Sequence, residues 1–163
     1  MSMIAARGAL FAALWTIAPP LFAHEPVAKT IQPSALSASA RSAASAVDAF
    51  HAALRRGDTR SAAALLVSDA LIFEEGGAER TKAEYASHHL AADAAYTQAV
   101  PWVLTRRAGN SNGSVAWIAS EGRTTGTYKG KAVDRVTAET MVLRRTGRHW
   151  RIVHIHWSSA AQR

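Results

Sequence analysis

The sequence predicts an α+β protein in which three helices cover one face of a curved antiparallel sheet. Residues 35–95 are rich in alanine and carry apolar side chains mostly at helical spacing. Residues 98–158 instead hold long runs of β-branched and aromatic residues separated by turn signals. Helices grouped before a set of consecutive strands are typical of α+β layers. A chain of 163 residues with 48% hydrophobic residues is long enough to bury one such core.

The first residues have the pattern of a secretory signal peptide. Arg7 precedes an apolar run that ends at Pro19 and Pro20, and Ala23 offers a small residue for cleavage. The run is shorter than the roughly 20 residues that cross a bilayer. We therefore expect a signal peptide at residues 1–23, a flexible lead-in at 24–34 and a domain at 35–159. We also expect a periplasmic or secreted location, without membrane contact after cleavage.

Composition restricts the classes of function. The chain has no cysteine, which excludes disulfides and thiolate metal ligands. Its formal net charge is +7, but the basic residues are spread over turn edges and strand ends, where charged side chains are ordinarily solvated. We therefore expect no nucleic-acid partner.

Two helices and a short strand are predicted first. Val47, Phe50 and Leu54 recur at helical spacing within residues 35–56, and Gly57 ends that helix. Asp58 is placed to cap a second helix that runs through Leu66. Residues 70–75 form a short apolar strand before two glycines, and a third helix is expected at residues 81–95.

Four long strands are predicted to follow as an antiparallel meander. They cover residues 98–108, 114–128, 133–145 and 147–158, with turns at residues 110–113 and 129–131. Side chains alternate across a strand, so His154 and His156 share a face with Trp150 and Ile152.

This order, with Gly57-Asp58 between two helices, residues 69–73 in the first strand and residues 147–158 at the end, resembles the nuclear transport factor 2-like superfamily. The resemblance covers residues 45–159 and is nearest to the SnoaL-like branch, whose function is unknown. The terminal segment is also similar to the last strand of the calcium/calmodulin-dependent kinase association domain. The resemblance implies a cone-shaped domain with a cavity between the curved sheet and the helices, and a homodimer formed by the sheet. It does not imply one function, since this scaffold carries isomerases, cyclases, dehydratases and oligomerisation modules.

Candidate ligand-binding residues lie on the third helix, the last strand and the end of the first strand. Residues four apart share a helix face, so one stripe is expected to place His89 between a phenol and a carboxylate. Two histidines of the last strand could line the same cavity, with Glu74 and Glu75 at its mouth. The candidates are Tyr85, His88, His89, Asp93, His154, His156 and Glu75.

A transition metal is the candidate cofactor, with no single metal identified. His89, His154 and His156 with one carboxylate would suit zinc or copper. For proton transfer, which the isomerases of this superfamily perform with a carboxylate base and a phenol donor, the base could be Asp93, Glu121 or Glu139, with Tyr85 or Tyr128 as donor.

Three functions stay open at this point. The sequence favours an exported domain that binds a small ligand or a metal ion without catalysis. The first alternative is a small-molecule isomerase, lyase or hydrolase that uses a carboxylate or histidine base. The second alternative is a dimerisation module.

Overall fold

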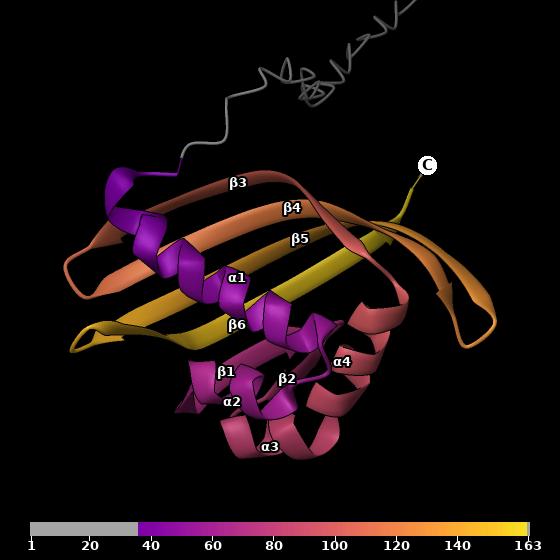
Figure 1. Cartoon of the computed structure of the whole chain (residues 1–163), viewed down its shortest axis with the longest axis horizontal. Helices are drawn as coiled ribbons and strands as arrows, with labels where there is room; N and C mark the ends of the chain where they lie inside the picture. The colour runs from indigo at the N-terminus through magenta and orange to yellow at the C-terminus, as the bar shows by residue number, and fades with distance from the viewer. Residues whose placement is uncertain (1–35, 163) are drawn as a thin grey trace, which may run out of the picture. The chain divides into compact units, whose positions relative to one another are not determined.

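A computed structural model describes residues 36–162 of the chain. The expected signal peptide and lead-in, residues 1–23 and 24–34, lie outside the described residues. Within residues 36–162 no helix is both long and apolar enough to span a bilayer. The α+β class predicted from the sequence is confirmed (Figure 1).

The helices precede most of the strands, as expected. They are the 3₁₀ helix η1 (Ala38–Ala40), α1 (Arg41–Arg55), α2 (Thr59–Leu65), α3 (Lys82–His88) and α4 (Leu90–Ala99). The strands are β1 (Leu66–Glu74), β2 (Gly77–Glu79), β3 (Trp102–Asn112), β4 (Val115–Tyr128), β5 (Lys131–Thr146) and β6 (His149–Ala161). Asp58 caps α2 as predicted, because its Oδ1 accepts the Ser61 N–H at 3.0 Å.

All six strands form one sheet in the order β2-β1-β6-β5-β4-β3. Strands β3 to β6 are the predicted antiparallel meander. The sheet is not antiparallel throughout, because β1 pairs with β6 in parallel. Hairpin turns dictate antiparallel pairing only between successive strands, whereas β1 and β6 are separated by two helices and four strands, which leave either direction open.

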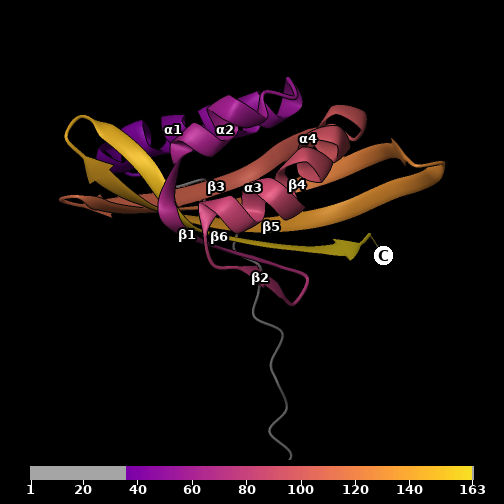
Figure 2. The same ribbon diagram turned by 90° about the horizontal axis from the view of Figure 1, so that it is seen from below.

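Helix α1 lies across the face of the sheet (Figure 1), and α2 and α4 lie on the same side (Figure 2). The buried residues of α1 recur every three or four positions and include Val47, Phe50 and Leu54. These side chains pack against inward-facing sheet residues such as Ile118 and Met141, which are fully buried. Burial of this apolar face fixes α1 above the sheet.

The expected third helix is divided in two. His89 ends α3 and begins α4 with φ −118° and ψ −33°, so residues 81–95 are not one continuous helix. No glycine or proline marks the break in the sequence. Two side-chain contacts are found at the break. The His89 ring contacts Glu79 on β2, and the Tyr85 hydroxyl of α3 donates to Asp93 of α4.

Strand β6 carries one extra residue relative to β5. Leu143 pairs with Ile152, but Val142 pairs with His154, so Val153 has no partner and forms a β-bulge. Trp150 and Ile152 before the bulge are buried toward the helices, and so is Ile155 after it. A bulge shifts the alternation of side chains by one residue. Beyond Val153, odd-numbered residues therefore face the helices and even-numbered residues face away.

Candidate functional site

A cavity of about 690 Å³ lies between the helices and the inner face of the sheet. It is walled by α1, α4 and all six strands, and its lining is mixed, with apolar and aromatic side chains around several charged ones. The polar and aromatic residues that line it include His51, Glu74, Glu75, Glu79, His89, Asp93, Tyr96, Trp102, Thr124, Tyr128, Lys129, Arg135, Thr137, Glu139 and Trp157.

A row of polar side chains crosses the inner face of the sheet from β1 to β3. Strand pairing places Glu74 beside Trp157, Trp157 beside Glu139, Glu139 beside Ser120, and Ser120 beside Arg107. Neighbouring strands are about 4.8 Å apart, so Glu74 and Glu139 are roughly 10 Å apart along this row. These five residues form the inner row of the sheet.

Glu139 lies in the middle of the inner row and is only 6% exposed. The Trp157 indole N–H donates to its Oε2 at 2.8 Å, and His51 Nε2 from α1 lies 2.8 Å from the same oxygen. The His51 contact is a close one between the ring nitrogen and the carboxylate, without the alignment of a regular hydrogen bond. Burial alone would raise the pKa of Glu139, but His51, Trp157 and the more distant Arg107 together hold that pKa below its usual value. Glu139 is therefore ionised at neutral pH.

His51 is held between Glu139 and an aromatic wall. Its ring stacks on the Trp102 indole with centroids 5.0 Å apart and planes 13° apart. The Trp102 N–H donates to Thr137 Oγ1 at 3.0 Å. This position needs Gly122, because a Cβ there would lie 2.2 Å from Trp102 Nε1. The other ring nitrogen of His51, Nδ1, makes no hydrogen bond within residues 36–162, so it is available to a molecule in the cavity.

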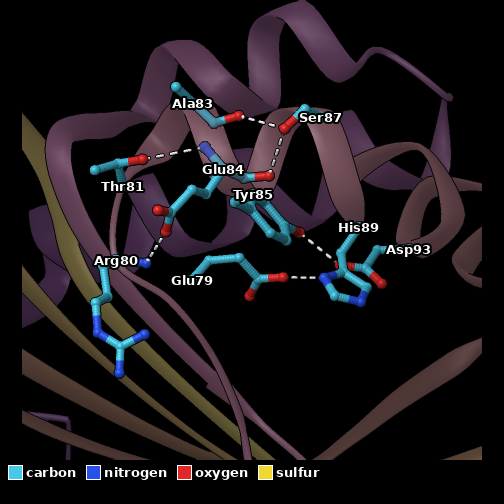
Figure 3. A network of polar contacts seen from close by, with 9 residues as sticks. All are labelled: Glu79, Arg80, Thr81, Ala83, Glu84, Tyr85, Ser87, His89 and Asp93. Atoms are coloured by element: carbon cyan, nitrogen blue, oxygen red, sulfur yellow. Dashed lines mark hydrogen bonds and ion pairs between the residues drawn. The ribbon is translucent and has the colours of Figure 1, made fainter.

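A second group of acidic side chains lies at the β1 end of the inner row. The Tyr85 hydroxyl donates to Asp93 Oδ2 at 2.7 Å (Figure 3). Burial raises the pKa of Asp93, although the Tyr85 hydrogen bond and nearby His89 oppose the shift. Burial also raises the pKa of Tyr85, so its phenol stays protonated. Glu74 has its pKa raised to about 7 by burial and then by the charges of Asp93 and Glu75.

His89 and Glu79 form an ion pair beside this acidic group. Nδ1 of His89 contacts Oε1 of Glu79, which is buried at the end of β2 (Figure 3). The sequence predicted His89 between Tyr85 and Asp93. Instead Tyr85 binds Asp93 directly, because the helix break at His89 turns its imidazole toward Glu79.

The structure brings together some of the residues proposed from the sequence. Glu75, His89 and Asp93 line the cavity, and Tyr85 lies behind Asp93. His88 is exposed and does not line the cavity.

His154 and His156 do not share the cavity with His89, contrary to expectation. Both lie after the Val153 bulge, on the outer face of the sheet, where their rings contact Phe73. The proposed metal set of His89, His154 and His156 is therefore divided between two faces of the sheet. Within residues 36–162 no three His, Asp or Glu side chains are grouped closely enough to hold a metal ion.

His51 was not selected from the sequence, Glu74 was expected only as a carboxylate at the mouth of the cavity, and Glu139 was only one of three candidate bases. A signal for His51 exists, since it lies between Phe50 and Leu54 and four residues after Val47. Its position therefore borders the apolar face of α1. Glu139 lies within an otherwise apolar strand, a pattern shared by exposed Glu121, so alternation alone could not separate the two.

The sequence and fold are similar to those of known proteins. A family model described as the SnoaL-like domain matches residues 43–162. A candidate ketosteroid isomerase from Shewanella frigidimarina NCIMB 400 is 36% identical, with 72% of this chain and 94% of that chain covered and a TM-score of 0.69. No curated protein is a significant match.

Two more distant solved structures share the fold. A candidate dehydratase of the nuclear transport factor 2-like family from Streptomyces avermitilis is 19% identical, with 76% and 97% coverage and a TM-score of 0.65. A candidate calcium/calmodulin-dependent kinase II association domain from Xanthomonas campestris is 21% identical, with 78% and 94% coverage and a TM-score of 0.66.

The raised pKa of Glu74 predicts a particular dependence of stability on pH. Between its ordinary pKa of 4.5 and about 7, the unfolded chain loses the Glu74 proton while the folded chain keeps it. The unfolded state then binds fewer protons, so the free energy of unfolding falls as pH rises through this window. Glu74→Gln should stabilise the protein at about pH 8 and not at about pH 4, as measured by urea unfolding. An equal effect at both pH values, or destabilisation at the higher one, would contradict the assignment.

Proposed function

The chain belongs to the SnoaL-like family of the nuclear transport factor 2-like superfamily, and from that premise we propose that its cavity binds a small organic molecule and moves a proton on it. The reaction class is that of an isomerase or lyase, with His51 as general base and acid. Of the functions left open by the sequence, this is the alternative with a histidine base. The expected export signal would place this activity in the periplasm or outside the cell.

The contact between His51 and Glu139 carries the proposal. A neutral imidazole that takes a proton becomes cationic, and an ionised carboxylate 2.8 Å away stabilises that cation. Glu139 is ionised although it is buried, and its position is fixed by Trp157. Stacking on Trp102 holds the imidazole plane. Such a pair is suited to proton transfer at Nδ1, the ring nitrogen that is available to a ligand.

Two further observations support catalysis over simple binding. A carboxylate buried for packing alone is costly, and perturbed carboxyl groups inside a cavity are more frequent at catalytic sites. Here Glu139, Glu74 and Asp93 all have shifted pKa values and all line one cavity. The Shewanella protein described as a candidate ketosteroid isomerase is 36% identical, and isomerases of that name transfer protons.

We further propose that the chain forms a homodimer through the outer face of the sheet. Val115, Trp117 and Val136 are apolar residues exposed on the strands of that face, each at least 45% exposed. The shared fold with a candidate kinase association domain is consistent with assembly through this scaffold. Light scattering at micromolar concentration should give a dimer, and Trp117→Glu should convert it to a monomer. A monomeric parent protein would refute the dimer.

Exchange of α-protons for solvent deuterium in 2-tetralone, followed by NMR, tests the catalytic proposal. We expect the protein to accelerate exchange and His51→Asn to lower the rate about 10²- to 10⁴-fold, the usual contribution of a general base. Glu139→Gln should also lower the rate, because the imidazolium loses its counter-charge.

His149→Asn is the matched control, since His149 is an exposed histidine at the start of β6. Its exchange rate should equal that of the parent. A protein that binds the ketone without accelerating exchange would support the non-catalytic binding function instead.

A further inference from the structure

The charge of the cavity is opposite to that of the chain. The chain has a formal net charge of +7, yet the cavity is lined by five carboxylates and only two formal cations. The carboxylates belong to Glu74, Glu75, Glu79, Asp93 and Glu139. Glu139 contacts His51 and Glu79 contacts His89, and the other three acidic side chains form no ion pair within residues 36–162.

Those three are Glu74, Glu75 and Asp93. Within the described part of the chain, neither Glu74 nor Glu75 makes a side-chain hydrogen bond or ion pair, and Asp93 accepts only from the Tyr85 hydroxyl. The two formal cations of the lining are engaged elsewhere. Arg135 donates to Ser159 Oγ at 2.8 Å, and Lys129 Nζ lies 5.2 Å from the centroid of the Tyr128 ring.

Buried polar atoms in the same lining also lack partners. Glu139 is 6% exposed and its Oε1 accepts no hydrogen bond, and Thr124 is 5% exposed with no hydrogen bond at its hydroxyl. Buried acceptors without a donor are costly, so a native cavity that holds them is suited to a ligand that brings N–H or O–H groups. These atoms lie on β4 and β5, apart from the acidic group on β1 and α4.

We propose that the cavity takes a small molecule that carries a protonated amine, with the ammonium group against Glu74 and Asp93. This inference rests on the proposed function in that it names the class of ligand for the same cavity. Glu74 and Glu139 are roughly 10 Å apart along the inner row. His51 contacts Glu139. A ligand about 10 Å long with its amine at Glu74 therefore places its far end beside His51.

The walls suit the remainder of such a ligand. Trp102, Tyr96 and Tyr128 line the cavity and supply apolar faces for a ring or chain. Aromatic faces also attract cations, as the position of Lys129 over Tyr128 illustrates.

Binding of an amine should be coupled to proton release. The pKa of Glu74 is about 7, so at a lower pH this carboxyl must lose its proton before it pairs with an ammonium group. Asp93, Glu75 and the Tyr85 phenol interact with it electrostatically, and the titratable groups Glu79 and His89 line the same cavity. Amine affinity should therefore rise between about pH 6 and about pH 8, while the affinity of a neutral analogue should stay constant.

Three probes of one skeleton test the inference by calorimetry: 4-phenylbutylamine, 4-phenylbutanol and 4-phenylbutanoate. We expect the amine to bind at least about tenfold more tightly than the alcohol, and the carboxylate most weakly. Equal binding of amine and alcohol, or preference for the carboxylate, would overturn the inference. This comparison needs only the parent protein.

Variants locate the amine. Glu74→Gln should remove most of the preference for amine over alcohol, and Asp93→Asn should reduce it if Glu74→Gln does not fold. Glu121→Gln removes an exposed carboxylate that does not line this cavity, so the preference should stay unchanged. A preference that survives both cavity substitutions would overturn the placement.

The outcome is separable from that of the proton-transfer test, because 2-tetralone carries no amine. Exchange without amine preference would retain the proposed function and overturn this inference. Amine preference without exchange would retain this inference and leave a non-catalytic amine-binding protein.

Discussion

The register of β6 against β5 controls the contacts of the cavity, because one unpaired residue decides which side chains of β6 face inward. Val153 forms a bulge, and beyond it Ile155 and Trp157 face the helices. Trp157 can then donate to Glu139 and lie beside Glu74 in the inner row. Without the bulge, His154 and His156 would face inward, and Glu139 would lose its indole donor.

Environment separates the carboxyl groups of this cavity into two kinds. Glu139 is buried deeply but is compensated by His51 and Trp157, which keeps it ionised. In the described part of the chain neither Glu74 nor Asp93 forms an ion pair, and burial raises the pKa of both carboxyl groups; the charges of Asp93 and Glu75 raise the pKa of Glu74 further. Carboxyl groups whose pKa values are pushed apart can take different roles in one site. In this protein the ionised group supports His51, and the uncompensated pair is available to a positively charged ligand.

Local patterns in the sequence predicted local features of the fold, and long-range contacts explain what they missed. The helical spacing of α1, the Asp58 cap and the meander of β3 to β6 follow from neighbours in sequence. The parallel pairing of β1 with β6, the break at His89 and the Val153 bulge depend on contacts between distant segments. The bulge matters most for the site, because period-two alternation placed His154 and His156 inside. His51 was not predicted because its contacts are with Glu139 on β5 and Trp102 on β3, which are distant from it in sequence.

Nuclear Overhauser contacts of the Trp157 indole ring test the orientation of β6 most directly. The rings of Phe50 and Tyr85, whose centroids both lie 6.3 Å from that of Trp157, should give contacts to it. Contacts from Trp157 to Phe73 on the outer face instead would place the indole on the opposite side of the sheet. The inner row, the support of His51 by Glu139 and the division of the histidines would then all be wrong.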